Sequence, residues 1–375
     1  MRSKRTGFVT LAATALGLLL ATRTDAAVIH VTSVESKISE TGGCSLQEAI
    51  QSANFDANVA IDVVLPDGTD HFVTTQCEPG SGDDTIVLPT GLDLFIPRAV
   101  FDAHNPAGPT ATPLVFTNIT IEGNGATLQS HGPVSPMGAA VEVLTRAFAV
   151  GTATVNFYSN GVIVRTVSGT GSLTLRNLSI KGFTARGGDG GVLAGGWAGS
   201  GGGGGGMGAG GAVYVFGSGE LVIENSTLVG NQAIGGDGTS YGNAGGGGMG
   251  GHGGASTDLY RMGGGGGGSG GNGSDDSGGT GGFGGGSYSS ATGHSVGVPC
   301  GGAGGPLGDF TNNDGHDATC PGGGGGGAGA KTDPLFPGTI YGGNGAYGGG
   351  GGGSPDQGGH GGFGAHIHGS GSNWL

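Results

Sequence analysis

Apolar and polar residues alternate along two short stretches of the chain, residues 173–176 and 221–224. In each stretch the first and third positions are Leu or Ile, and the second and fourth are Thr, Val or charged residues. Alternation with a period of two is typical of a β-strand with one buried face. The pattern therefore predicts that four side chains point into a core: Leu173, Leu175, Leu221 and Ile223.

The two stretches belong to a longer repeat, in which residues 173–190 correspond to residues 221–238. Both copies place Asn directly after the alternating stretch and end in Gly-Gly-Asp-Gly. Asn tolerates the left-handed backbone that a sharp corner requires, and self-similarity over a long period indicates a solenoid. We therefore expect two stacked coils of a parallel β-helix, with these pairs in register: Leu173 with Leu221, Asn177 with Asn225, and Arg176 beside Glu224.

Further strands are expected on both sides of each corner. Leu228 is expected to point inward after the second corner, and residues 212–216 and 162–167 are the expected incoming strands of the two coils. An earlier coil is predicted over residues 118–128, with Ile119, Ile121 and Leu128 inward. Pro106, Pro109 and Pro113 place the start of the coil stack near residue 110.

One helix is predicted, over residues 44–54. Ser45 and Glu48 form a capping box, and a stripe of apolar residues follows with helical spacing. Because a solenoid needs a cap on its open end, we expect this helix to cover the first coil.

The segment CSLQEAIQSAN, followed by a second Cys and by DTIVLP, resembles the CSLREA-type N-terminal segment of exported bacterial β-helix proteins, with Gln47 where Arg is usual. The run GGAV…LVIENSTLVGN is similar to the GGAI and FxxN repeats of polymorphic outer-membrane proteins, with Leu228 in place of Phe. The resemblance covers about residues 28–238. It implies a right-handed parallel β-helix on an exported, surface-exposed protein, and it implies no particular ligand.

Residues 1–26 have the pattern of a secretory signal: basic residues, an apolar segment and the small-residue cleavage site Thr24-Asp-Ala26. No later segment is expected to cross a membrane. The net charge of −14 argues against nucleic-acid binding, which needs a basic surface. Four cysteines allow three pairings, of which we favour Cys44–Cys77 and Cys300–Cys320 in an oxidising compartment. Zinc is the alternative, although no C-x2-C spacing occurs.

Glycine dominates the chain after residue 238 and accounts for 97 of the 375 residues. Three alternatives remain open for this region: a disordered tail, because such a composition buries little apolar surface, a bundle of polyproline-II-type glycine strands, and extended loops on the β-helix. Aromatic residues within it are candidate contacts for a glycan or cell-surface ligand: Tyr241, Tyr260, Phe283, Tyr288, Phe363 and Trp374.

Candidate chemistry is sparse in this sequence. The strand carboxylates Glu122, Glu142, Glu220 and Glu224 form no recognisable catalytic pair, so we assign no catalytic residue and no cofactor. Gly270–Asp275 fits the start of a calcium-binding nonapeptide, which makes Asp275 a candidate ligand in a single, incomplete copy.

The sequence thus predicts an all-β, right-handed parallel β-helix with four segments: a signal peptide (1–26), an N-terminal cap with the first strands (27–110), the coils (111–238) and a glycine-rich region (239–375). The expected function is that of a non-catalytic secreted or outer-membrane-associated surface protein, adhesin-like or structural. A secreted polysaccharide lyase or glycoside hydrolase of the pectate-lyase-like fold is the first alternative, and an ice-binding or coat-forming glycine bundle is the second. The oligomeric state is left open.

Overall fold

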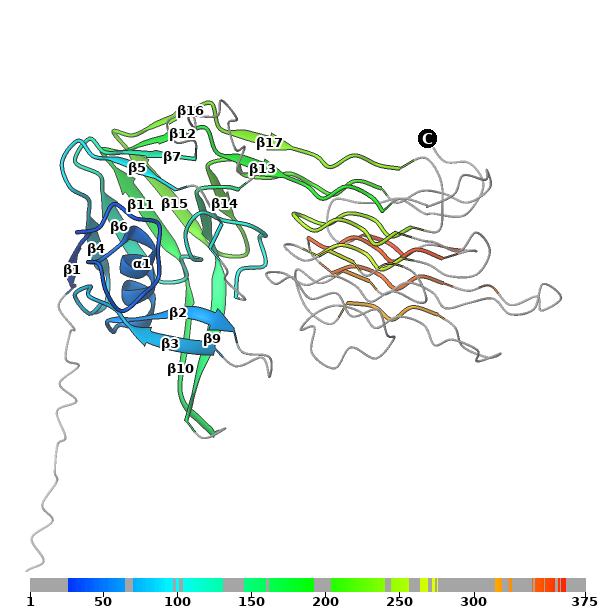
Figure 1. Ribbon diagram of the computed structural model, residues 1–375, viewed down its shortest axis with the longest axis horizontal. Coiled ribbons are helices and arrows are strands. Elements are labelled where there is room, and N and C mark those ends of the chain that lie inside the picture. Colours follow the sequence, from blue (N-terminus) through cyan, green and yellow to red (C-terminus); the bar gives the residue numbers. More distant parts are fainter. Residues whose placement is uncertain are drawn as a thin grey trace, which may run out of the picture.

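The protein is all-β with one helix. The computed structural model describes residues 26–64, 70–96, 99–100, 104–130, 145–159, 162–191, 204–239, 244–255, 264–268, 272–273, 275, 314–318, 324–325, 339, 341–346, 348–354, 357 and 359–361. The strands among these residues fall into six separate sheets (Figure 1). No helix in this part of the chain is both long and apolar enough to traverse a membrane.

Two parallel sheets hold the repeated units. The first has five strands in the order β1 (Val28–His30), β4 (Asp84–Val87), β6 (Asn118–Glu122), β11 (Ser172–Arg176) and β15 (Glu220–Glu224). The second has four strands in the order β5 (Asp93–Phe95), β7 (Thr127–Gln129), β12 (Ser179–Lys181) and β16 (Thr227–Val229). Each of the four units that begin at β4, β6, β11 and β15 therefore places one strand in the first sheet and the next strand in the second.

The predicted register between the two repeats is confirmed. Strand β11 pairs with β15 so that Leu173 lies opposite Leu221 and Arg176 opposite Glu224. Strand β6 continues the same register on the other side of β11. The stack begins earlier than the proline-rich stretch near residue 110, because β1 and β4 already belong to the five-stranded sheet. Apolar residues also alternate with polar ones before those prolines, and this explains why the sheet includes strands from both sides of the proline-rich stretch.

Side chains of the alternating positions form the core between the sheets. Ile29, Ile86, Ile121 and Leu175 are fully buried in one hydrophobic cluster. The last unit differs from this expectation, because Ile223 and Leu228 occupy the interior register but remain 41% and 44% exposed. Strands β15 and β16 have a described neighbour on one side only, so these interior positions are not covered as those of β11 and β12 are.

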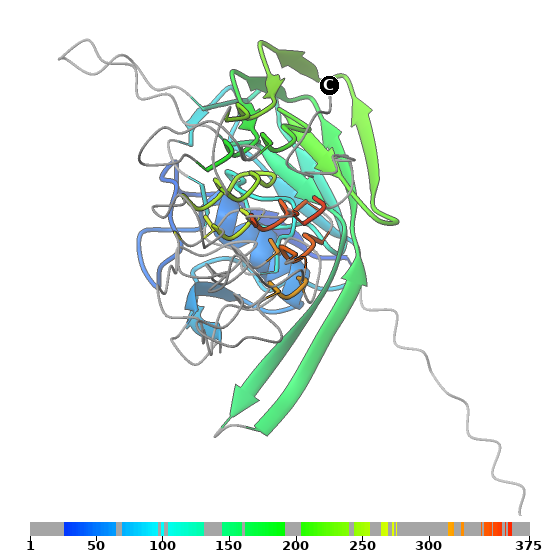
Figure 2. The same ribbon diagram turned by 90° about the vertical axis from the view of Figure 1, so that its right-hand side faces the viewer.

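The prediction that residues 162–167 form the incoming strand of the earlier repeat was wrong. Strand β14 (Val213–Val215) pairs in parallel with β8 (Phe148–Val150). The valine-rich run instead forms β10 (Val162–Thr170), which pairs antiparallel with β9 (Thr152–Ser159). This hairpin projects from the stack, and the outer part of β10 is exposed, so its alternation does not mark a core strand (Figure 2).

Helix α1 (Leu46–Phe55) begins at the predicted capping box of Ser45 and Glu48. Four of its apolar residues, Leu46, Ala49, Ile50 and Ala53, lie in the same core cluster as Ile29 and Ile86, so the helix closes the N-terminal end of the stack. The polar face of α1 is also buried, which the amphipathic pattern did not predict. Its residues bond to chain segments that wrap over the helix; for example, Asn54 Nδ2 donates to the carbonyl oxygen of Leu114 at 2.7 Å. An antiparallel pair, β2 (Val59–Val64) and β3 (Asp70–Thr74), follows the helix.

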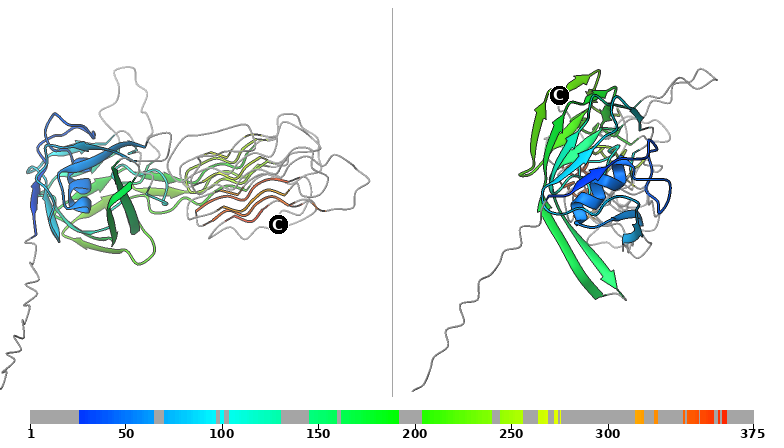
Figure 3. Two further views of the ribbon diagram at one scale, coloured as in Figure 1. Left: turned by 90° about the horizontal axis from the view of Figure 1, so that it is seen from below. Right: turned by 90° about the vertical axis from the view of Figure 1, so that its left-hand side faces the viewer.

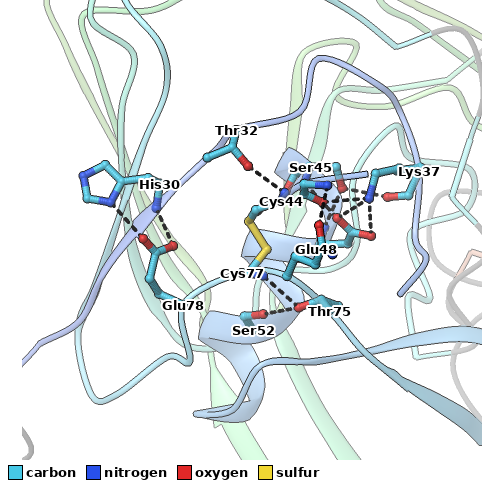
Figure 4. The surroundings of a disulfide bond; sticks show 12 residues. His30, Thr32, Lys37, Cys44, Ser45, Glu48, Ser52, Thr75, Cys77 and Glu78 are labelled. Carbon is cyan, nitrogen blue, oxygen red and sulfur yellow. Dashed lines mark hydrogen bonds and ion pairs between the residues drawn. A yellow bond between two sulfur atoms is a disulfide. The ribbon is translucent and has the colours of Figure 1, made fainter. Parts of the chain in front are cut away.

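A disulfide joins Cys44, directly before the N-cap of α1, to Cys77 (Figure 4). This pairing was predicted from sequence and is present. It closes a loop with a sequence separation of 33 residues, for which the loss of chain entropy in the unfolded state corresponds to about 3–4 kcal/mol. The helical lid is therefore held covalently to the segment that leads into β4.

Glycine segments form hydrogen-bonded layers beside the stack (Figures 1 and 3). Backbone bonds recur at intervals of three residues: Gly248, Gly251 and Gly254 donate to the carbonyl oxygens of Gly251, Gly268 and Gly265. Such spacing is what a helix with three residues per turn produces. Of the three alternatives for this region, the bundle is the one that predicts such spacing, and it stays a prediction.

Close approach of backbones explains why these positions are glycine. A Cβ atom at Gly188 would lie 1.8 Å from the carbonyl oxygen of Gly251, and one at Gly247 would lie 1.9 Å from that of Gly188. No side chain fits between layers at such distances. Repeated runs of glycine are therefore a packing requirement in this region.

Candidate ligand-binding groove

Three asparagines stand at corresponding corners of successive units. Asn124, Asn177 and Asn225 follow strands β6, β11 and β15, with φ angles of 51°, 51° and 48°. A left-handed backbone is uncommon in residues other than Gly, and Asn is among those that adopt it most readily. The two corners expected from the repeat, Asn177 and Asn225, therefore have the required conformation.

A groove of about 380 Å³ runs along these corners. The residues that line it are Asn124, Gly125, Asn177, Leu178, Ser179, Asn225 and Thr227. Most of them carry amide or hydroxyl groups, which both donate and accept hydrogen bonds. The groove thus presents a polar surface that repeats from one unit to the next, at the strand spacing of about 4.8 Å.

The three side-chain amides differ in how they are engaged. Asn124 Nδ2 donates to the carbonyl oxygen of Leu88 at 2.9 Å, and Asn177 Nδ2 donates to Glu122 Oε1 at 2.8 Å. No described residue forms a hydrogen bond with the exposed side-chain amide of Asn225. At the open end of the groove, one amide is therefore available to a ligand.

Beside the groove, charges of alternating sign follow the stack. Arg176 lies opposite Glu122 on one side and Glu224 on the other. Its Nε donates to Glu224 Oε2 at 2.6 Å, with both side chains 46% exposed. Each carboxylate is thus balanced by a neighbouring donor, which favours a structural role for the row of charges.

The Arg176–Glu224 pair is expected to contribute little to stability, because exposed ion pairs are screened by water. Replacing both residues with Ala, singly and together, should give a coupling energy of about 0.5 kcal/mol in urea denaturation. This coupling should shrink in 1 M NaCl. A coupling of several kcal/mol would contradict the exposure of the pair.

Catalysis by paired carboxylates requires both groups to face a reacting bond. Glu122 and Glu224 are separated by Arg176 and are occupied by Asn177 and Arg176, respectively. Glu220 begins β15, opposite Ser172, and Glu142 lies outside the described residues. The described strand carboxylates therefore form no catalytic pair in this part of the chain.

A second polar surface borders the glycine layers. Along it, Asp and Asn side chains accept hydrogen bonds from the backbone N–H groups of adjacent segments, as Asp189 does from Asp237 at 2.7 Å. The same contact is made by Asn272, Asp275, Asp314, Asp317 and Asn344, which accept from His252, Ala255, Tyr341, Asn344 and His360, respectively. These side chains therefore satisfy backbone N–H donors of the glycine layers.

Asp275, the candidate calcium ligand, is one of these residues. Its Oδ1 accepts from the N–H of Ala255 at 2.7 Å. Among the residues that the structure describes, no three His, Cys, Asp or Glu side chains gather as a metal site would require. The position of Asp275 thus has a structural explanation in the bundle.

A small charged cluster marks the junction of the strands and the glycine layers. Arg186 bonds to Asp189 at 2.6 Å and to Asp237 at 3.1 Å. The Arg186 guanidinium holds the pKa of Asp189 below its usual value. On the same side, Nδ1 of His252 accepts the backbone N–H of Asp189 at 3.0 Å. The cluster ties together the ends of both repeats and a glycine segment.

Sequence reasoning did not single out Asn124 as a corner residue. Its corner contains extra residues compared with that of Asn177, so the two copies do not align there. The Asn124-Gly125 dipeptide, a strong turn signal, was available to identify it. Cys300, Cys320 and the aromatic residues Tyr241, Tyr260, Phe283, Tyr288, Phe363 and Trp374 lie outside the described residues.

Comparisons with known proteins do not name a family for this chain. No protein-family model, curated protein or solved structure matches it.

Proposed function

We propose that this chain is an exported, non-catalytic surface protein in which a right-handed parallel β-helix carries a rigid glycine bundle. In this proposal, the asparagine-lined groove binds neutral glycans at the cell exterior. The β-helix provides a stiff base, and the bundle projects from it.

One observation carries the proposal: the register of the coils continues into the glycine layers. Strand β13 (Thr184–Arg186) pairs with β17 (Gln232–Ile234), 48 residues later. Beyond these strands, Gly187 and Gly190 donate to the carbonyl oxygens of Ile234 and Asp237, so the offset is nearly maintained. A bundle that grows from the coils in this way is held as rigidly as the coils themselves, which favours a structural or adhesive role.

The choice of ligand follows from the chemistry of the groove. Asn and Ser side chains, with their paired donors and acceptors, match the hydroxyl groups of a sugar. Two carboxylates beside the groove and a net charge of −14 disfavour polyanions. Neutral oligosaccharides are therefore the ligand class with the best fit.

Binding is tested with the mature chain and immobilised neutral glucans, mannans and galactans. The Asn225→Gly substitution removes the available amide and keeps the left-handed corner, because Gly adopts positive φ at no steric cost. Loss of about one net hydrogen bond should weaken binding three- to tenfold. Val162→Thr, on the projecting hairpin, is the matched control and should bind as the unaltered chain does.

Other outcomes would replace the proposal. Release of reducing ends or unsaturated products from pectins would assign the chain to the lyase or hydrolase class. Inhibition of ice recrystallisation without glycan binding would assign the function to the glycine bundle.

A further inference from the structure

Asp84 is a buried carboxylate with no counter-ion among the residues that the structure describes. It begins β4 and is 1% exposed. Its Oδ1 accepts backbone N–H groups from Ser81 at 2.8 Å and from Ala27 at 3.0 Å. Its Oδ2 is buried and has no hydrogen-bond partner among the described residues. Burying an unpaired charge is costly, so a positively charged partner at this carboxylate would stabilise its ionised form.

The negative charges around Asp84 disfavour its ionised form further. Desolvation by burial raises the pKa of Asp84, the backbone N–H groups of Ser81 and Ala27 lower it, and the carboxylates of Asp56 and Asp83 raise it, with a net upward shift. Both of these neighbouring charges are acidic. A cation would therefore be stabilised here.

The backbone nitrogen of Ala27 contacts Asp84 directly, and it becomes a cation if the chain is cleaved before Ala27. As an amide it has a single hydrogen, yet it faces two acceptors, Asp84 Oδ1 at 3.0 Å and the carbonyl oxygen of Ser81 at 3.2 Å. An ammonium group has three N–H donors and would satisfy both acceptors. It would also supply the missing positive charge.

Ala27 is also the residue that follows the expected signal peptide. Ala26 is exposed and Ala27 is half-buried, so the chain enters the fold between these two residues. Hydrolysis there adds water across the Ala26–Ala27 peptide bond. The products are a carboxylate on Ala26 and an α-amino group on Ala27, which is protonated at neutral pH.

We propose that Asp84 is the preformed counter-ion for the α-ammonium group of Ala27, and that cleavage between Ala26 and Ala27 completes the N-terminal end of the β stack. The inference rests on the export that the proposed function assumes. It assigns a modification site and a molecular consequence of processing: the leader-bearing chain keeps an unbalanced buried carboxylate, and the processed chain does not.

The pH dependence of the two forms follows from the sign of each linkage. Pairing with Asp84 raises the folded-state pKa of the α-amino group, so its stabilising contribution is present below the ordinary α-amino value of about 8 and is lost as pH rises through the raised value. In a chain with an amide at Ala27, burial raises the pKa of Asp84. That form is therefore relatively destabilised as the pH rises through the range in which Asp84 ionises.

The experiment compares the mature chain 27–375 with a free α-amino group and the same chain acetylated at Ala27. Acetylation restores an amide and removes the charge. We expect a higher melting temperature for the free form at pH 6–7 and convergence of the two forms above about pH 9. Labelling of the free amine near pH 8 should be about tenfold slower than in the unfolded chain.

The variant Asp84→Asn removes the counter-ion and keeps the size of the side chain, and Asp83→Asn is the exposed neighbouring control. Acetylation should lower the melting temperature of the unaltered chain and of Asp83→Asn, but not that of Asp84→Asn. If Asp84→Asn does not fold, the free and acetylated forms of the unaltered chain still decide the question. Equal melting curves for these two forms would overturn the proposal.

The natural cleavage site is read by N-terminal sequencing of the protein exported with its own leader. A mature chain that starts at Ala27 supports the proposal, and any other start contradicts it. Both measurements are independent of glycan binding. A mature chain with the Ala27–Asp84 pair that binds no glycan would thus overturn only the proposed function.

Discussion

Adding one methyl group at Gly247 should lower the free energy of unfolding of the glycine bundle by about 3 kcal/mol. The Cβ atom would lie 1.9 Å from the carbonyl oxygen of Gly188, and the contacted atoms belong to the backbone, which cannot rotate away. Overpacking of a tight interior typically costs ~1–3 kcal/mol, and more where the neighbours are rigid. Hydrogen exchange of the glycine amides and calorimetry of Gly247→Ala measure the effect.

The adjacent residue provides a matched control for this prediction. At Gly246 a Cβ atom would be no closer than 3.5 Å to any other residue, which is ordinary contact. Gly246→Ala should therefore be neutral or slightly stabilising, because Ala restricts the unfolded chain by about 0.4–1 kcal/mol. Equal effects of the two substitutions would show that the layers are not packed as described. Gly236 and Gly235 form a second pair of the same kind, with closest approaches of 2.0 Å and 3.7 Å.

Replacing Lys37 with Met should destabilise the protein by about 3–5 kcal/mol, because it leaves the Glu48 carboxylate buried without its cation. Lys37 Nζ contacts both carboxylate oxygens of Glu48, at 2.8 Å and 2.9 Å, and Glu48 is fully buried (Figure 4). The same carboxylate accepts the backbone N–H groups of Ser39 and Ser45. The pair therefore holds the helical lid against the segment before it.

Urea denaturation with the disulfide intact measures this loss. Adding Glu48→Gln to Lys37→Met should recover most of the stability, since no charge then remains buried. Lys181→Met, on an exposed strand position, should change stability by less than about 0.5 kcal/mol. A small effect of Lys37→Met would indicate that Glu48 is reached by water.

A local motif, the spacing of the cysteines and the sequence repeat predicted several parts of the fold. These are the capping box of α1, the Cys44–Cys77 bridge and the pairing of Leu173 with Leu221. The partner of a strand that lacks a repeated copy could not be read in this way. The alternation in residues 162–167 suits any strand, and only the tertiary structure shows that it pairs with the preceding strand β9 rather than with a strand of the repeated units.

The candidate groove was partly predictable for the same reason. Asn177 and Asn225 were identified because the repeat aligns them, whereas the longer corner at Asn124 breaks the alignment. Whether the Asn225 amide has a hydrogen-bond partner depends on which unit is last in the stack, and a corner motif does not report this. Asp84 is unusual because its Oδ2 is buried without a described partner, and the pattern of charges along a sequence does not report burial.

The register of β13 and β17 continues into the glycine layers, and this has a consequence for how such a protein can lengthen. Because α1 closes the N-terminal end, new units can be added only beyond β15, β16 and β17. A tandem duplication of residues 187–234 would supply four further strands together with another glycine segment. The two halves of the molecule would then grow in step, and the height of the projection would be set by the number of duplicated units.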